Sequence, residues 1–453
     1  MSATKTPEKP KPIVPAGSYI FARNDFYEMA LKFSPAWAPR GLAHASGAWW
    51  VARKDGRWDR LDESELIAGV YTWGARQFVP AGDDGFRKMP MNQNVVTNII
   101  HALQAAHTIK GDPTCPGVPL ADGWMDMVTR EVKPYELEFF VSDTLPFASG
   151  QVDAHSPELW LNFLGQGFSA KDISLLQEWF GYCLVPGNKY HRILWLYGSR
   201  GCGKSLITNI LIEMLGGVPR IAVRKADDFR SNFAGDLLGK RLIYFQDYRH
   251  AGARDAPALN FVLTVSTNDP VKIEQKYKEG FTARLPGKIV FSSNEMPSFK
   301  DNTGAMMRRL LIMHRKSRVG PPDPDLEGKL MAELPRILGW ALDGLKRLTE
   351  RGDFDAGMLD QKLIDNALRG TAPVVAWAKD FLKFEEDGSA RKFDLFTSWT
   401  LYADGRGHHK SFSQESLMGP LFQAAEELGY RLSSDPSGRK VLGVRILKME
   451  ERE

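Results

Sequence analysis

One short segment of the chain has the residue types and spacing that bind a phosphate chain. It reads Gly198-Ser199-Arg200-Gly201-Cys202-Gly203-Lys204-Ser205 and matches the pattern GxxxxGK(S/T) at every fixed position. Glycines let the backbone turn its N–H groups towards phosphate oxygens. In this pattern Lys204 reaches the β- and γ-phosphates, and Ser205 coordinates Mg²⁺. We therefore expect a nucleoside triphosphate site, with ATP and Mg²⁺ as its ligands.

The residues on either side of this loop fit a strand that leads into it and a helix that follows it. Ile193–Tyr197 is an apolar run of strand type, and Leu206–Leu215 has the apolar spacing of a helix. A phosphate-binding loop requires this context, because the N-terminus of the helix favours anions. Cys202 is expected to be a small filler of the loop; the alternative is a thiol made somewhat acidic by the helix.

Hydrolysis also needs a carboxylate near the phosphates, and a second strand can deliver one. The run Leu242–Phe245 is apolar and is followed by Gln246 and Asp247. We predict that Asp247 binds Mg²⁺ or its water, and weigh this against a plain aspartate at a strand end. Many ATPases have two acids at this point. Gln246 therefore leaves open whether Asp247 or an acid from elsewhere is the catalytic base.

A third strand and the segment after it supply an amide and two arginines. Lys288–Ser293 ends at Asn294, and Arg308 and Arg309 follow. An amide at a strand end near the γ-phosphate can orient the attacking water, although an isolated asparagine is more often a turn residue. An arginine that reaches a neighbouring subunit's γ-phosphate can neutralise charge in the transition state. The alternative for this arginine pair is a salt-bridged surface.

The composition of the chain sets limits on its class. Of 453 residues, 43% are hydrophobic and 25% are charged, which is typical of a soluble globular protein. Three widely spaced cysteines argue against a disulfide framework or a zinc knuckle and fit a reducing cytosol. No apolar run approaches the length that spans a bilayer, so we expect a cytoplasmic protein with no membrane partner.

Changes in pattern along the chain predict its domains. Residues 1–18 are rich in proline and lysine and predict a flexible tail. We expect an N-terminal α+β domain over 19–150, a helical lead-in over 151–190, an α/β core over 191–350 and a winged-helix-like unit over 371–453.

Some individual elements are also predicted from these patterns. In the N-terminal domain they are strands around Trp50 and Trp58, a helix over Asn94–His107 and a hairpin over Trp124–Glu131. In the C-terminal unit they are helices over Val374–Phe384 and Ser413–Leu428 and strands over Tyr430–Leu432 and Val441–Leu447.

The order of these features resembles superfamily 3 helicases. The resemblance is closest to the C-terminal part of phage and plasmid primases, which is related to the poxvirus primase-helicase. Leu176–Leu184 is similar to the family's helical lead-in, Asn294–Pro297 to its third motif and Leu334–Leu342 to a helix after its core. The resemblance covers most of the chain.

The resemblance implies a role for each motif residue and an AAA+-like P-loop ATPase core. It implies Lys204 and Ser205 as Walker A, Asp247 as Walker B, Asn294 as sensor 1, and Arg309 as the arginine finger, with Arg308 in reserve. It also implies a ring, usually hexameric, with each ATP site at a subunit junction. Such a ring moves along one DNA strand.

The family has a hairpin between Walker B and sensor 1 that projects into the channel of the ring, and Lys272–Gly280 occupies this interval. Gly280 is suited to its turn. Residues 271–316 contain ten Lys or Arg against four acids, whereas the net charge of the whole chain is only +4. Lys276 and Lys278 are therefore predicted to bind DNA phosphates; the alternative is an ordinary solvated hairpin.

The C-terminal unit offers a second candidate contact with DNA. Arg439 and Lys440 lie in the connection between the two expected strands, where a wing touches a duplex backbone. Winged helices also act as protein docking modules, and the sequence favours neither partner.

These features together predict an ATP-dependent DNA helicase or translocase that replicates a phage, satellite or plasmid in the cytoplasm of a bacterial host. Its expected partners are single-stranded and forked DNA, further copies of itself in a homo-hexamer, and a separate primase, because no paired-acid priming motif is recognised. A second hypothesis, which Gln246 favours, is an origin-binding initiator whose ATP binding controls assembly. A third is a packaging motor or a P-loop regulator acting on protein.

Overall fold

The computed structural model describes most of the chain. The described residues are 15–81, 85–109, 115–225, 234–248, 256–275, 278–297, 305–316, 323–355, 360–404 and 412–451. They divide into two compact units: one comprises residues up to Asp126 together with Glu131–Thr144, and the other comprises Met127–Arg130 and the residues from Leu145 onward. Among these residues, no helix has both the length and the apolar composition that crossing a bilayer requires.

The first unit packs helices against small antiparallel sheets. Its helices are α1 (Phe26–Trp37), α2 (Glu63–Gly74) and α3 (Gln93–His107). Its strands are β1 (Leu42–Ala45), β2 (Ala48–Ala52), β3 (Trp58–Leu61), β4 (Phe78–Ala81), β5 (Gly85–Lys88), β6 (Val118–Pro119), β7 (Trp124–Met125) and β8 (Val132–Lys133). Phe33, Leu66 and Ile99 are fully buried, because each helix turns one apolar face inward. The strands predicted around Trp50 and Trp58 are β2 and β3, and the predicted hairpin is β7 with β8.

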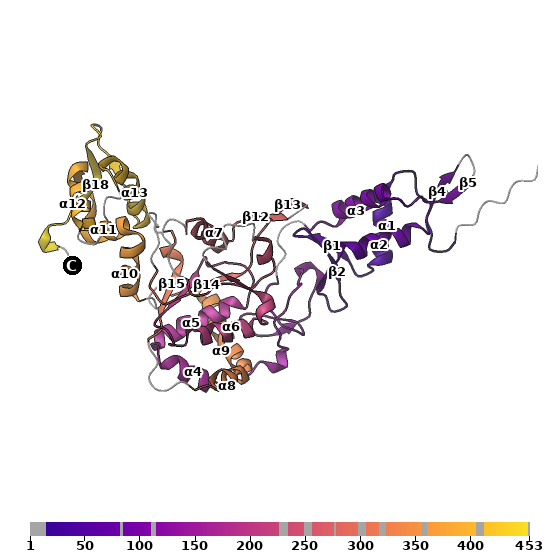
Figure 1. The fold of residues 1–453 in the computed structure, drawn as a ribbon, viewed down its shortest axis with the longest axis horizontal. Coiled ribbons are helices and arrows are strands. Elements are labelled where there is room, and N and C mark those ends of the chain that lie inside the picture. The colour runs from indigo at the N-terminus through magenta and orange to yellow at the C-terminus, as the bar shows by residue number, and fades with distance from the viewer. Residues whose placement is uncertain are drawn as a thin grey trace, which may run out of the picture. The chain divides into compact units, whose positions relative to one another are not determined.

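The second unit is built on a parallel sheet (Figure 1). Among the described residues its strands lie in the order β10 (Ile221–Arg224), β11 (Leu242–Phe245), β14 (Lys288–Ser293), β9 (Ile193–Tyr197) and β15 (Leu310–His314). Each neighbouring pair is parallel, so the carboxyl ends of the strands lie at one edge of the sheet, the carboxyl edge, and their amino ends at the opposite amino edge. Every residue of β9, β11 and β14 is buried, as expected where both faces of a sheet are covered. The prediction of an α/β region with a mainly parallel sheet is confirmed.

A row of aromatic rings fixes the register of the three central strands. Phe245 of β11, Phe291 of β14 and Trp195 of β9 are paired across the sheet. The ring centroids are 4.4 Å apart for Phe245 and Phe291, and 4.7 Å apart for Phe291 and Trp195. A shift by one residue would turn a ring to the other face of the sheet. The row therefore holds the carboxyl ends of these strands level with one another.

Helices precede, connect and follow these strands. They are α4 (Glu158–Gly165), α5 (Ala170–Cys183), α6 (Lys204–Met214), α7 (Ala256–Ser266), α8 (Leu326–Ala332) and α9 (Leu334–Arg351). Helices α5 and α9 approach closely, since a Cβ at Gly344 would lie 2.3 Å from the carbonyl oxygen of Gln177. Between them the buried carboxylate of Glu178 accepts hydrogen bonds from Arg347, at 2.8 Å, and from Arg351. These hydrogen bonds link α5, which precedes the sheet in the sequence, to α9, which follows it.

A hairpin lies between β11 and β14 in the sequence. Its strands β12 (Val271–Gln275) and β13 (Lys278–Ala283) are antiparallel, so the predicted hairpin is present. Gly280 lies inside β13 and not in the turn, because Gln275 pairs directly with Lys278. The prediction of Gly280 as the turn residue is therefore wrong.

The C-terminal part of this unit joins helices to a small antiparallel sheet. Its helices are α10 (Gln361–Thr371), α11 (Pro373–Phe381), α12 (Lys392–Asp404) and α13 (Gln414–Glu427), and its strands are β16 (Leu382–Arg391), β17 (Ser433–Ser434) and β18 (Lys440–Ile446). Strand β18 pairs with both β16 and β17. Trp377, Trp399, Leu421 and Val444 are buried in the core of this part.

One element prediction for the C-terminal part is confirmed with a shorter extent, and another is wrong. The helix predicted over Val374–Phe384 is α11, which ends at Phe381 because the chain then enters β16. Tyr430–Leu432 is not a strand, and the short strand β17 follows it instead. Strand β16 escaped prediction because its middle reads Glu385-Glu386-Asp387-Gly388, which is typical of a loop. The residues on either side of this middle pair with β18, and the register shifts between Phe384 and Ser389.

Candidate nucleotide-binding site

The loop between β9 and α6 needs glycine at several positions. Gly201 and Gly203 have φ values of 76° and 96°, a left-handed conformation that side chains rarely adopt. A Cβ at Gly203 would also lie 3.0 Å from the ring of Phe163 on α4. At Gly198 a Cβ would lie 2.3 Å from the carbonyl oxygen of Arg315. Backbone conformation therefore requires glycine at Gly201 and Gly203, and close packing requires it at Gly198.

The side chain of Lys204 lies back along the loop and is 6% exposed. Its Nζ donates hydrogen bonds to the carbonyl oxygens of Gly198, at 2.8 Å, and Ser199, at 3.1 Å. A third bond, of 3.1 Å, goes to Oδ1 of Asn294, directly after β14. The structure thus brings Lys204 and Asn294 together, although 90 positions separate them in the sequence. A phosphate oxygen that binds the ammonium group would replace one of these acceptors.

Asp247 lies at the same edge of the sheet, beyond β14. The order β11-β14-β9 places the ends of β11 and β9 on either side of the end of β14, with about 10 Å between the outer strands. Asp247 is exposed and has a φ of 48°, in the left-handed region. Its neighbour Tyr248 is buried and donates its backbone N–H to the carbonyl oxygen of Ser292. The buried tyrosine anchors the turn that presents Asp247 at the surface.

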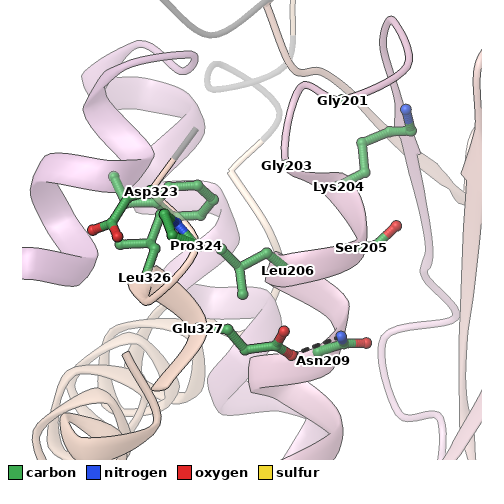
Figure 2. Close-up of a pocket in the computed structure, with 11 residues that line it drawn as sticks. Gly201, Gly203, Lys204, Ser205, Leu206, Asn209, Asp323, Pro324, Leu326 and Glu327 are labelled. Atoms are coloured by element: carbon green, nitrogen blue, oxygen red, sulfur yellow. Dashed lines mark hydrogen bonds between the residues drawn. The ribbon is translucent and has the colours of Figure 1, made fainter. Parts of the chain in front are cut away.

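Ser205 occupies the first turn of α6 and is exposed. Figure 2 shows Lys204 and Ser205 directed to one side of α6, whereas Leu206 is directed to the other side. Within the described residues, no group of three or more His, Cys, Asp or Glu side chains could hold a metal ion. Mg²⁺ commonly takes only one or two protein ligands beside phosphates and water. The Ser205 hydroxyl and the Asp247 carboxylate have the right chemistry for that arrangement.

A cavity of about 360 Å³ adjoins the loop on the side of Leu206 (Figure 2). Its apolar lining includes Phe163 and Leu206, together with Pro324 and Leu326 from the segment after β15. Asn209 on α6 and Glu327 on α8 close one side of it through a 2.9 Å hydrogen bond. The lining also includes Lys204, Ser205 and Asp323, so polar and apolar groups contribute about equally. The volume lies in the range of small-molecule sites.

Arg315 contacts the loop, and the sequence analysis assigned it no role. It directly follows β15, is 1% exposed, and donates from Nε to the carbonyl oxygen of Cys202 at 2.9 Å. Cys202 is itself buried, in agreement with its expected role as a filler. No motif marks Arg315, because its partners on α4 lie about 150 positions earlier in the chain.

The two candidate finger arginines lie at the other edge of the sheet. They precede Leu310, which pairs with Ile193 at the start of β9, whereas the loop follows the end of β9. Along five residues of strand this separation is about 16 Å. Arg308 is exposed; Arg309 is half-buried and donates from Nη1 to the carbonyl oxygen of Ala305 at 2.6 Å. The structure therefore does not bring either arginine to the loop of its own chain.

The basic excess of residues 271–316 is only partly at the surface. Lys276 lies outside the described residues, and Lys278 is the first residue of β13. Arg315 is buried, and so is Lys288, which is 0% exposed. Burial lowers the pKa of Lys288 to about 7, while burial raises the pKa of nearby Cys183 to about 12.

The connection between β17 and β18 presents Arg439 and Lys440 at the surface. Asp435 accepts the backbone N–H of Lys440 at 2.7 Å, and a hydrogen bond from the Ser437 hydroxyl is the main cause that holds the pKa of Asp435 below its usual range. Lys440 pairs with the exposed Arg391 of β16. The tip of this sheet, defined as Arg391, Arg439 and Lys440, is therefore basic. By contrast, α13 contains no Lys or Arg.

Comparisons with known proteins give one family match and several similar structures. Residues 196–309 match the model of a family described as a family of unknown function, DUF5906. Similar solved structures include apo structures of the NrS-1 C-terminal region. One, an A form, has 14% identity and a TM-score of 0.48 and covers 93% of this chain and 98% of that chain. Another has 15% identity and a TM-score of 0.48, with 93% and 99% covered. A third has 15% identity and a TM-score of 0.47, with 90% of each chain covered.

Proposed function

We propose that this protein is an ATP-dependent DNA helicase or translocase of superfamily 3 type that acts in replication of a phage, satellite or plasmid. The observation that carries the proposal is the hydrogen bond from the Lys204 ammonium group to Asn294, at a glycine loop that joins a buried strand to a helix. The strand order β11-β14-β9 supports the proposal. In this order β14, which ends directly before Asn294, lies between the strand that leads to the loop and the strand that leads to Asp247. This is a P-loop core with its polar groups at one edge.

In this proposal each residue has a defined task, and Asp247 has two. The N–H groups of the loop and the Lys204 ammonium group bind the β- and γ-phosphates. The Asn294 amide orients the attacking water. The Asp247 carboxylate accepts a proton from this water or holds the water in place. The cavity beside Leu206 holds the nucleoside. Bound Mg²⁺ neutralises charge on the phosphates, and Ser205 and Asp247 are the residues that would hold it.

The proposal includes a ring, because one chain cannot complete the site. Arg308 and Arg309 lie at the amino edge, about 16 Å along the strand direction from the loop of the same chain. Either arginine can therefore act only on the γ-phosphate of another copy. A closed ring in which the amino edge of one subunit faces the carboxyl edge of the next gives every site an arginine, and a homo-hexamer is the proposed form.

DNA binding is assigned to the hairpin β12–β13 and to the basic tip of the C-terminal sheet. Lys278 pairs with Gln275 at the start of β13, and Lys276 belongs to the same segment of the sequence. In the C-terminal part we assign phosphate contact to the tip, because α13 lacks the positive charge that a helix needs against a DNA backbone. The C-terminal helices and the sheet β16–β18, against which they pack, together resemble a winged helix. The tip of the sheet corresponds to the wing.

The test is DNA-dependent turnover by the full chain. ATP hydrolysis is measured with Mg²⁺, with and without single-stranded DNA, and strand displacement is measured on a forked duplex. We expect DNA to stimulate hydrolysis and the fork to be unwound. Particle size with nucleotide and DNA is measured in parallel and should correspond to a ring. A monomer whose hydrolysis is indifferent to DNA would contradict the proposal.

The second candidate function is an origin-binding initiator whose ATP binding controls assembly. The observation that favours it is that the turn after β11 presents one carboxylate, Asp247, beside the neutral Gln246. Slow hydrolysis would then hold an assembled state. Binding of ATP and duplex DNA without strand displacement would select this function, and robust displacement would reject it.

A further inference from the structure

The guanidinium group of Arg315 joins the loop to helix α4. Besides its bond to Cys202, it donates from Nη1 to the carbonyl oxygen of Leu164, at 3.0 Å, and from Nη2 to that of Phe163, at 2.7 Å. Its central carbon lies 4.4 Å from the ring centroid of Phe163 and 4.9 Å from that of Phe168. A guanidinium group holds its donors in a rigid plane. The carbonyl groups that it joins are therefore fixed relative to one another.

The backbone of Arg315 contacts the beginning of the same loop. Its N–H donates to the carbonyl oxygen of Tyr197, the last residue of β9, at 2.8 Å. Its own carbonyl oxygen lies so close to Gly198 that a Cβ there would be 2.3 Å away. One residue thus contacts both the start and the end of the loop. Movement of one end relative to the other would break contacts of Arg315.

The bond to Cys202 also determines where a loop N–H points. In a trans peptide the C=O and the N–H point in opposite directions. Since the carbonyl oxygen of Cys202 faces Arg315, the N–H of Gly203 faces away from Arg315. Gly203 is the residue before α6, so this N–H belongs to the helix N-terminus that would bind a phosphate oxygen.

We infer that Arg315 is a positioning residue for phosphate binding: it orients the loop amides before the nucleotide arrives and couples the loop to α4. The inference rests on the proposed nucleotide-binding function. The role of Arg315 lies in specific recognition of the phosphate chain and not in stability of the fold alone. A residue that only stabilises the unit would alter the affinity for nucleoside di- and monophosphates alike, because it would change the fraction of folded protein.

The test compares two conservative substitutions in the full chain. Arg315→Lys keeps the positive charge but replaces the planar fork with a single nitrogen, which cannot hold all the carbonyl groups. Arg347→Lys is the control, since the Arg347 guanidinium group likewise joins two segments of the chain, by bonds to the Glu178 carboxylate and the Ser174 carbonyl in the α5–α9 pair. Dissociation constants are measured with fluorescent analogues of ADP and AMP, and thermal unfolding is recorded without nucleotide.

We expect Arg315→Lys to weaken ADP binding about tenfold, the factor that corresponds to 1.4 kcal/mol, with a much smaller change for AMP. Arg347→Lys should leave the ratio of the two dissociation constants unchanged. An unchanged ratio in Arg315→Lys, together with tight wild-type binding that depends on Lys204, would overturn the inference and leave the proposed function intact. Wild-type protein that binds no nucleotide would instead reject the proposed function.

A second variant keeps the inference testable if Arg315→Lys does not fold. Phe168→Leu removes one of the rings against which the guanidinium group packs and leaves its hydrogen-bond acceptors in place. Phe168 does not line the cavity beside the loop. We expect the same change in the ADP to AMP ratio, about threefold in size, since a buried cation–π contact is worth about 0.5–2 kcal/mol. An unchanged ratio in folded Phe168→Leu would count against the inference.

Discussion

The two edges of the parallel sheet differ in how they use polar side chains. At the carboxyl edge Lys204 and Asn294 contact each other, and Asp247 and Ser205 are exposed. At the amino edge Lys288 is fully buried under carbonyl groups, while Arg308 is exposed. The first edge has groups that converge on one place. The second has one buried amine and one charge that faces outward, and its described side chains do not converge on one place.

In the proposed function, this difference means that a single chain carries two complementary parts of one site. Parallel strands bring their carboxyl ends together, so distant motifs such as the loop and Asn294 can meet there. The arginines before β15 are separated from that meeting point by the length of the strand. The proposed ring rests on this separation, and it can be tested by variants taken from the largest expected effect to the smallest.

The largest effect is expected at the carboxyl edge. Lys204→Ala removes the ammonium group that would bind the β- and γ-phosphates, so ATP hydrolysis should fall to background and nucleotide binding should weaken. Lys240→Ala is the matched control, because Lys240 donates to the carbonyl oxygen of Pro219 away from the loop. Steady-state hydrolysis and binding of a fluorescent nucleotide are measured. Normal turnover by Lys204→Ala would contradict the site itself.

The next effect tests the amino edge. Loss of the finger arginine should lower turnover about 10³-fold while ATP affinity stays the same. The family resemblance assigns Arg309, whereas the exposure of Arg308 lets it reach another subunit without loss of the Arg309 bond to Ala305. Arg308→Ala and Arg309→Ala are therefore measured separately, and the variant that loses turnover but keeps affinity identifies the finger.

Mixing of variants tests whether the two edges work across subunits. Lys204→Ala rings supply intact arginines, and rings of the finger variant supply intact loops. A mixture should regain part of the activity, because some junctions then combine both intact halves. Activity of the mixture no higher than that of the separate variants would show that the arginine and the loop do not complete one site.

How far the sequence predicted this arrangement depends on how local each signal is. Strands β9, β11 and β14 were predictable, because each is a short apolar run. The glycine loop and Asn294 were predictable because they directly follow such strands. Arg315 was not predictable, since its acceptors on α4 are far away in sequence. Strand β16 was missed because its charged middle is typical of a loop, while the residues on either side of it pair with the distant β18. Features that depend on long-range partners leave no local pattern.

A smaller effect is expected for the residues assigned to DNA. Replacement of Lys276 and Lys278 by alanine should weaken single-stranded DNA binding about tenfold at low salt and reduce the slope of log K against log salt by about 1.4. Nucleotide binding should stay the same, because the hairpin lies outside the loop. Replacement of Arg439 and Lys440 should affect duplex binding more than single-strand binding. Unchanged DNA binding in the first variant would remove the hairpin from the assignment.

The smallest effect concerns the buried charge at the amino edge. The Nζ of Lys288 donates to the carbonyl oxygen of Val185, at 2.7 Å, and to that of Gly187, and it lies 4.2 Å from the ring centroid of Tyr182. Burial lowers its pKa from 10.5 to about 7. Above pH 7 the unfolded chain therefore keeps a proton at this position that the folded chain releases. The free energy of unfolding should then rise with pH above 7.

The Lys288 effect can be isolated by the choice of pH window and control. Between pH 7 and 8.5 the rise should be on the order of 1 kcal/mol, measured by urea unfolding. Cys183, whose pKa is raised from 9.0 to about 12, opposes the rise mainly above pH 9, where the thiol of the unfolded chain is mostly ionised. The pKa values of His44 and His107 are lowered by burial, away from this window. Lys288→Met should remove the rise, while Lys240→Met should retain it. An equal rise in both variants would mean that the carbonyl groups and the Tyr182 ring keep Lys288 charged despite its burial, and the amino edge would then be stabilised by a permanent cation.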